Sequence, residues 1–328
     1  MASSSRRNFL HATATGAFGL AATSAIAGQA PRPGMPTGNL LSAKDTNRIS
    51  ILSYSFLGLF KSGRMDIFGY LESCRHRYGL DAANIWNGML TSMDEDYLKK
   101  VREALDERDL TLCVLTTDST HVWDPDPALR AKNKANTLAH LNAARILGAE
   151  FVRIDAGGSS SGDRTSPASK AWSNEAFDGI VAGYREYAKY AADHGFKAGP
   201  ENHWGAEGIW PNMQKLYKAI APTPGFGLSV HMSQWQGTQA EKDLADAESA
   251  PWVVAVHMDN DTCNGPLEQK MSLLRNAGYK GWYVVENHSN GENEYAMTGI
   301  QVAQVRKVLQ SWRTGTTPPG RGPGTGSA

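Results

Sequence analysis

The sequence predicts a (β/α)8 TIM barrel, an α/β fold in which helices surround a parallel eight-stranded barrel. Three observations predict it: strand-like and helix-like segments alternate strictly, they form eight pairs within residues 48–314, and no GxGxxG or Walker sequence follows the first strand. Alternating units imply a parallel sheet with right-handed crossovers. Eight units in a span of this length favour a closed barrel over an open, doubly wound sheet.

Short runs of apolar residues predict the strands, at residues 49–56, 82–86, 110–115, 150–154, 197–201, 227–231, 252–257 and 282–286. Apolar residues at helical spacing predict the helices, at residues 65–78, 94–108, 127–147, 174–194, 211–220, 240–249, 266–277 and 296–312. We expect Gly148 to end the third of these helices and Asn174 to cap the start of the fourth. A polar loop, with a glycine- and serine-rich stretch at its start, precedes that cap.

The two ends of the chain have a composition that does not predict a packed fold. Arg6 and Arg7 lie in a twin-arginine signature, and an alanine- and glycine-rich run follows it. This pattern predicts a Tat signal and a periplasmic or secreted protein, with a disordered basic tail as the alternative. The run is too short and too weakly apolar to predict a membrane span. The expected parts are a signal peptide at 1–27, a linker at 28–47, the barrel at 48–314 and a disordered tail at 315–328.

Charge and cysteine content exclude two classes of protein. Lysine plus arginine and aspartate plus glutamate number 33 each, so no basic excess indicates a nucleic-acid partner. The three cysteines, Cys74, Cys113 and Cys263, are widely spaced and form no CxxC motif. We therefore expect buried thiols and no disulfide framework.

Four successive predicted strands, beginning with the fifth, each end in a side chain that can bind a metal ion: Glu201, His231, His257 and Glu286. Any one of them alone is explained as well by a structural hydrogen bond or ion pair. In a parallel barrel, however, residues at the carboxyl ends of the strands point into one basin. Two carboxylates and two imidazoles suit one divalent ion such as Mn²⁺, Co²⁺, Zn²⁺ or Mg²⁺, and the imidazoles favour the transition metals.

From Ile49 to the last helix, the chain resembles the xylose isomerase-like TIM barrels, the sugar phosphate isomerase/epimerase superfamily. The residues that carry the resemblance are ILSYSF at 51–56, GPENH at 199–203, VHMD at 256–259 and VENH at 285–288. The resemblance implies a carbohydrate substrate and one divalent metal held by Glu201, His257 and Glu286. His231 stands where the family usually has aspartate.

Other departures from the family pattern leave the reaction open. Gln234 stands where the family often has histidine, Asn84 where many members have glutamate, and Cys263 where ketose 3-epimerases have arginine. The resemblance therefore implies the barrel and the metal more firmly than any one sugar reaction. It leaves the oligomeric state open.

The implied chemistry is proton transfer α to a carbonyl through a metal-stabilised enediolate, as in isomerases and epimerases. By the resemblance, Glu201 and Glu286 both bind metal and move the proton. Alternatively, His203 or His288 is the base, because an ordinary histidine titrates near pH 6.5. The expected substrate-binding residues are Asn84, Trp86, Asp155, Trp204, Gln234 and Asp259.

Three alternatives remain. The same enediolate supports elimination from a 3-keto-glycoside, and the predicted export favours this lyase because glycosides are met outside the cytoplasm. A barrel that binds sugar without catalysis is a second alternative, suggested by His231. A metal-dependent hydrolase like endonuclease IV is the least favoured, because the sequence shows neither extra metal ligands nor a basic groove.

Overall fold

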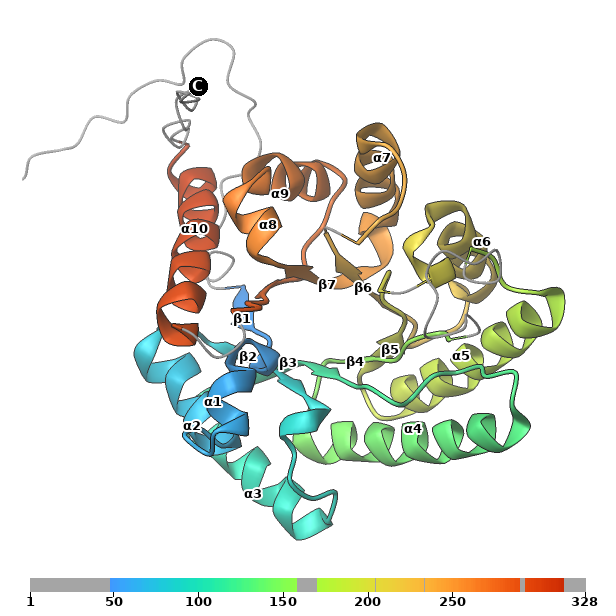
Figure 1. The fold of residues 1–328 in the computed structure, drawn as a ribbon, viewed down its shortest axis with the longest axis horizontal. Helices are drawn as coiled ribbons and strands as arrows, with labels where there is room; N and C mark the ends of the chain where they lie inside the picture. The colour runs from blue at the N-terminus through green and yellow to red at the C-terminus, as the bar shows by residue number, and fades with distance from the viewer. Residues whose placement is uncertain (1–47, 158–169, 204, 233, 290–292, 316–328) are drawn as a thin grey trace, which may run out of the picture. The chain divides into compact units, whose positions relative to one another are not determined.

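The strands of the computed structural model are parallel, and the helices lie outside them (Figure 1). The structure describes residues 48–157, 170–203, 205–232, 234–289 and 293–315. Within these residues the strands are β1 (Ile49–Ile51), β2 (Ala82–Trp86), β3 (Thr111–Thr116), β4 (Phe151–Arg153), β5 (Lys197–Gly199), β6 (Leu228–His231), β7 (Val253–Met258) and β8 (Trp282–Val285). All of them belong to the unit that spans Leu40–Ala328.

Hydrogen bonding divides the strands into two four-stranded sheets, with the orders β1-β8-β7-β6 and β2-β3-β4-β5. Three parallel bridges join the sheets. Leu52, just after β1, pairs with Asn84 of β2, Ala198 of β5 pairs with Phe226, just before β6, and Glu201, just after β5, pairs with Ser229 of β6. The ring of strands is therefore closed, which confirms the predicted (β/α)8 TIM barrel. On β6 and β7, His231 and His257 are register partners, so their side chains start from neighbouring positions.

The helices follow the strands along the chain. They are α1 (Leu57–Lys61), α2 (Ile67–Glu72), α3 (Glu95–Asp106), α4 (Pro127–Leu147), α5 (Asn174–Asp193), α6 (Trp210–Ile220), α7 (Gln239–Ser249), α8 (Asn260–Asn264), α9 (Leu267–Asn276) and α10 (Glu294–Thr314). Gly148 ends α4 in the left-handed conformation, as predicted. The cap of α5 is Ser173 and not Asn174, since the Ser173 hydroxyl accepts a hydrogen bond from the backbone N–H of Ala176.

The hydrophobic core lies mainly between the strands and the inward sides of the helices, where large side chains such as Phe56, Tyr184 and Tyr217 are buried. All three cysteines are buried and free, as the sequence predicts. Burial raises the pKa of the Cys113 thiol, which donates to the Ser50 hydroxyl at 3.1 Å. A thiol in this environment is unreactive.

The first strand is shorter than the sequence predicts. It ends at Ile51, and Ser53–Phe56 forms a 3₁₀ turn that leads directly into α1. Two hydroxyls in this turn make contacts that end the strand: Ser53 accepts a hydrogen bond from the backbone of Trp86, and Ser55 accepts one from the backbone of Asn287. These partners are distant in sequence. The local pattern at 49–56 therefore predicts a strand and gives no sign that the strand ends early.

Several predictions concern residues outside those that the structure describes: the Tat signal, the linker, most of the polar loop before α5, Trp204 and nearly all of the C-terminal tail. Among the helices that are described, none combines the length and the apolar character that a membrane crossing requires.

Candidate active site

A cavity of about 650 Å³ lies where the carboxyl ends of the strands meet. Strand-end residues line it, among them Trp86 of β2, Arg153 of β4 and His231 of β6. Glu201 and Glu286 line it from the residues just after β5 and β8. The topology alone brings these side chains together, because every strand of a parallel barrel ends at the same rim.

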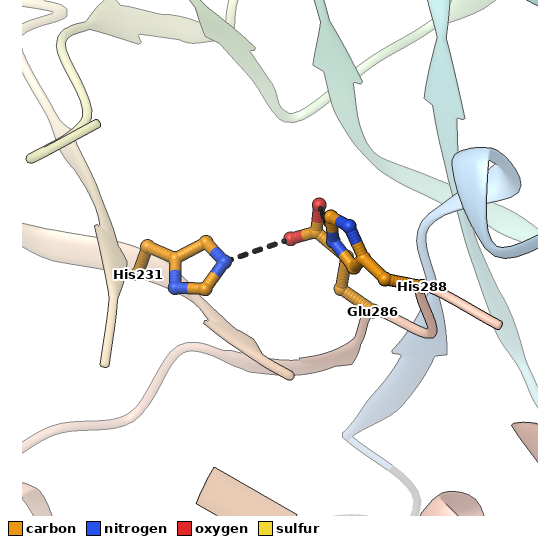
Figure 2. A group of neighbouring side chains, drawn as sticks. All are labelled: His231, Glu286 and His288. Carbon is orange, nitrogen blue, oxygen red and sulfur yellow. Dashed lines mark hydrogen bonds and ion pairs between the residues drawn. The ribbon is translucent and has the colours of Figure 1, made fainter. Parts of the chain in front are cut away.

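The four predicted metal ligands are linked by short contacts. The Nδ1 atom of His257 lies 2.7 Å from Oε1 of Glu201 and 3.5 Å from Oε2 of Glu286. The Nε2 atom of His231 lies 3.3 Å from the same Oε2 of Glu286. In Figure 2 the imidazole of His231 points at the Glu286 carboxylate, beside which His288 lies. All four ligands are buried.

The residues present fit a divalent metal. Oε2 of Glu286 is a buried carboxylate oxygen without a hydrogen-bond partner, and it faces the two imidazoles at ion-pair distance. A buried acceptor without a donor is costly unless an ion or a proton compensates it. Among the described residues, two groups of three possible ligands have all their ligand atoms within 4.8 Å of one another: His231 with Glu286 and His288, and Asp155 with Glu201 and His203. The predicted set of four thus spans both groups, and His257 joins them.

Asn202 fixes the position of His231. Its side-chain oxygen accepts a hydrogen bond from the backbone N–H of His231 at 2.6 Å, and its amide nitrogen donates to the His231 carbonyl at 2.9 Å. Asn202 is the middle residue of the first Glu-Asn-His run. One short sequence therefore supplies the candidate ligand Glu201 and the side chain that orients a candidate ligand on the next strand.

Close pairing of charges shifts the pKa values of the candidate ligands. Burial would lower the pKa of His231, but the close contact with the negatively charged Glu286 outweighs burial and raises this pKa to about 9. Burial would raise the pKa of Glu201, yet His257 and Arg153 lower it to about 2. Burial also opposes the ionisation of Glu286, whose pKa is nevertheless held well below its usual value by His231, His288 and His257. Both carboxylates are therefore ionised at neutral pH.

Arg153 at the end of β4 was not predicted from the sequence. It is buried, and its guanidinium contacts three carboxylates: Asp155 at 2.7 Å, Asp118 at 3.1 Å and Glu201 at 3.3 Å. Glu207 also lines the cavity and was likewise not predicted from the sequence. It accepts a hydrogen bond from the backbone N–H of Ala156 at 2.6 Å, and burial raises its pKa well above the usual value.

The two histidines that follow the glutamates both line the cavity. The Nε2 atom of His288 lies 2.9 Å from Oε1 of Glu286, and its side chain is 47% exposed. The hydrogen bond to Glu286 raises the pKa of His288. The Nδ1 atom of His203 lies 3.5 Å from Oδ2 of Asp155. His288 thus connects a buried carboxylate to the open part of the cavity.

Two residues that we expected to touch substrate lie elsewhere. Asn84 is fully buried and its amide nitrogen lies 3.0 Å from Nε2 of His257, while its oxygen accepts a hydrogen bond from the Thr116 hydroxyl. Asn84 is therefore behind His257, where it orients the ring. Asp259 caps the short helix α8 by accepting a hydrogen bond from the backbone N–H of Thr262 at 2.8 Å, and it does not line the cavity. Both placements depend on side-chain directions that strand ends do not specify.

Trp86, Asp155 and Gln234, the other described candidates for substrate binding, all line the cavity. The indole of Trp86 meets the ring of Tyr54 edge to face, with ring centres 5.1 Å apart. Tyr54 lies in the 3₁₀ turn Ser53–Phe56, which the sequence predicts as part of the first strand. Tyr54 was therefore not among the predicted site residues.

A sequence model of the xylose isomerase-like TIM barrel family matches residues 76–309, more than half of the chain. The chain belongs to the xylose isomerase-like TIM barrel family. The match includes all four candidate metal ligands as well as Arg153.

Solved structures of this fold include sugar epimerases. An L-ribulose 3-epimerase is 13% identical, with a TM-score of 0.67 over 81% of this chain and 96% of its own. A 3-keto-D-glucoside 4-epimerase from E. coli is 14% identical, with a TM-score of 0.62 over 74% and 94%. A xylose isomerase-like TIM barrel protein from Mycobacterium smegmatis in complex with magnesium is 13% identical, with a TM-score of 0.61 over 84% and 100%. At these identities the likeness shows the fold alone.

Among curated proteins, the urease accessory protein UreD of Saccharophagus degradans is 30% identical over 110 residues. The aligned part is 33% of this chain and 36% of that protein, so the chain spans about a third of its relative's length. Two thirds of each chain remain unaligned, and the family assignment therefore rests on the family model.

Proposed function

We propose that the protein is a divalent-metal-dependent sugar isomerase or epimerase that moves a proton α to a carbonyl. The observation that carries the proposal is the convergence of two ionised carboxylates on one imidazole: Nδ1 of His257 lies 2.7 Å from Glu201 and 3.5 Å from Glu286. Membership of the family supports it, and so do the sugar epimerases among the structures of similar fold.

Glu201, His231, His257 and Glu286 would hold the metal. When bound, a divalent ion would polarise the substrate carbonyl and stabilise negative charge on its oxygen. Two imidazoles in the set favour Mn²⁺, Co²⁺ or Zn²⁺ over Mg²⁺. Since a metal needs the neutral form of His231, and pairing with Glu286 raises the pKa of His231 to about 9, binding would release a proton near neutral pH.

Glu286 is the carboxylate best placed to hold and return a proton. His288 contacts its Oε1 at 2.9 Å and is itself half exposed, so a proton can pass from Glu286 through His288 to solvent. Glu201 is less suited to this task, because its close neighbours His257 and Arg153, at 2.7 and 3.3 Å, are both buried and offer no comparable path to solvent. His203 is the alternative base, since it lines the cavity on the side of Asp155.

The proposal is tested by proton exchange in D₂O, followed by NMR with a panel of ketoses and 3-keto-glycosides, on protein whose metal content is known from elemental analysis. The Glu286→Gln variant should remain folded, but its rate of proton exchange should fall by about 100-fold or more, which is the scale of general acid–base catalysis. The Glu201→Gln variant should lose bound metal as well as proton exchange. Exchange at the wild-type rate in Glu286→Gln would refute the assigned role.

A second candidate is elimination from a 3-keto-glycoside. A cavity of about 650 Å³ is in the range of drug-sized ligand sites, so it has room for a sugar that carries a leaving group. Release of the leaving group, measured beside the exchange, distinguishes this lyase from an epimerase. Sugar binding that is unchanged by a chelator, without exchange or release, would instead indicate a sugar-binding barrel.

A further inference from the structure

Arg153 is the one lysine or arginine among the described residues that line the cavity. Its three guanidinium nitrogens each contact a carboxylate: Asp155, Asp118 and Glu201. Only 4% of its side chain is exposed. Because it is buried and faces three carboxylates, the guanidinium offers almost no exposed surface to an anionic group of a ligand.

Asp118 occupies a distinctive place in this arrangement. Its Oδ1 faces Arg153 at 3.1 Å, and its Oδ2 accepts a hydrogen bond from the indole N–H of Trp86 at 2.7 Å. Its side chain is 48% exposed, whereas Asp155 and Glu201 are buried. Asp118 is thus the carboxylate that lies between the arginine and the open cavity.

The indole that Asp118 orients forms an aromatic wall together with Tyr54. The two rings meet at 80° with centres 5.1 Å apart, and both line the cavity. The ring of Tyr54 also lies 5.4 Å from that of His288, beside the candidate base Glu286. A flat apolar surface of this kind suits the C–H face of a sugar ring.

The charges around the cavity disfavour an anionic ligand. Besides Asp118, the carboxylates of Asp155, Glu201 and Glu286 line it, and like charges at short range repel. Specificity arises as much from repulsion of the wrong ligand as from attraction of the right one.

We propose that Asp118 selects unphosphorylated sugars: its carboxylate covers Arg153, which would otherwise attract a phosphate, and it holds Trp86 as a platform for an uncharged ring. This inference rests on the proposed function for the site and names its class of substrate. Asp118 acts on specificity through Arg153 and Trp86.

The test uses D-fructose 6-phosphate as the probe and titration calorimetry on protein loaded with Mn²⁺. In Asp118→Asn, the amide oxygen can still accept from Trp86, but the charge that covers Arg153 is gone. We expect this variant to bind the probe about tenfold more tightly than the wild type, the scale of a hydrogen bond to a charged group. Asp96→Asn on α3 removes the same charge from an exposed position outside the cavity, and its affinity should equal that of the wild type.

The same affinity in the wild type and Asp118→Asn, including no detectable binding by either, would overturn the proposal. So would a wild type that binds D-fructose 6-phosphate more tightly than D-fructose. As a second variant, Asp118→Ala should also gain affinity for the phosphorylated probe. Absence of proton exchange with every sugar would refute the proposed function and leave this binding comparison intact, so the two failures are distinguishable.

Discussion

Asn202 does not line the cavity. Its side chain nevertheless holds the backbone of His231 through two hydrogen bonds of 2.6 and 2.9 Å. Asn287 has the same place in the second Glu-Asn-His run, but its amide nitrogen donates only to the nearby Ser289 hydroxyl. The two identical tripeptides therefore differ in what they support. The first one orients a candidate ligand across β5 and β6, and the second one orders its own loop.

We expect Asn202→Ala to lower the free energy of unfolding by about 1–3 kcal/mol, because the buried backbone N–H of His231 loses its acceptor and the His231 carbonyl keeps only the N–H of Gln234 as a donor. Metal should also be retained less well, since His231 is no longer fixed. Urea denaturation and elemental analysis measure the two effects. Asn287→Ala is the matched control and should cost less on both measures; equal losses in the two variants would contradict the role of Asn202.

At the scale of secondary-structure elements, a buried ion pair connects α7 to α9. The ammonium of Lys270 lies 2.7 Å from Oδ2 of Asp246, whose Oδ1 accepts a hydrogen bond from the Trp235 indole at 3.0 Å. Trp235 directly follows Gln234, which lines the cavity. The pair therefore supports the loop after β6 from behind. Trp235 itself is buried, and its indole N–H is satisfied by Asp246.

The Lys270→Met variant should be less stable than the wild type by about 3 kcal/mol at pH 7, because the buried carboxylate of Asp246 loses its nearest cation. The double variant Asp246→Leu with Lys270→Met should be more stable than either of these single replacements, since neither buried charge of the pair then remains without the other. Urea denaturation of the four proteins forms the double-mutant cycle. Additive effects would show that the two residues do not interact.

The same pair predicts a pH dependence. Burial, partly offset by Lys270, raises the pKa of Asp246 from 3.8 to about 6. The folded state then binds more protons than the unfolded state between these two pH values, so the contribution of this group to stability is largest below pH 3.8 and is lost as the pH rises through about 6. In a comparison of unfolding free energies, Asp246→Asn should lack this component of the pH dependence.

At the scale of the whole barrel, closure depends on the close approach of β5 and β6. The backbone N–H of Ala198 donates to the carbonyl of Gly225 at 2.8 Å, and that of Gly227 donates to the carbonyl of Ala198 at 3.2 Å. A β-carbon on Gly199 would collide with the carbonyl oxygen of Gly227. Glycine is therefore required at position 199, in this seam between β5 and β6, two residues before the candidate ligand Glu201.

We expect Gly199→Ala to destabilise the barrel by about 2 kcal/mol or more, since backbone must move to admit the methyl group. Gly69→Ala in α2 is the control: its β-carbon would make only ordinary contacts, at 3.4 Å from Asp66 and 3.7 Å from Met65, and alanine favours a helix by about 0.5–1 kcal/mol. Thermal unfolding compares the two. Equal stability of Gly199→Ala and the wild type would show that the seam is more open than described.

The sequence by itself determined the closed parallel barrel and the strand ends that carry Glu201, His231, His257 and Glu286. It could do so because strand and helix periodicity are local patterns, and parallel strands bring their carboxyl ends to one rim. Only the tertiary structure decided that Arg153 contacts three carboxylates, that Asp118 lies between it and the cavity, and that Asn84 lies behind His257. Those contacts join residues far apart in the chain through side-chain directions, on which no local pattern carries information.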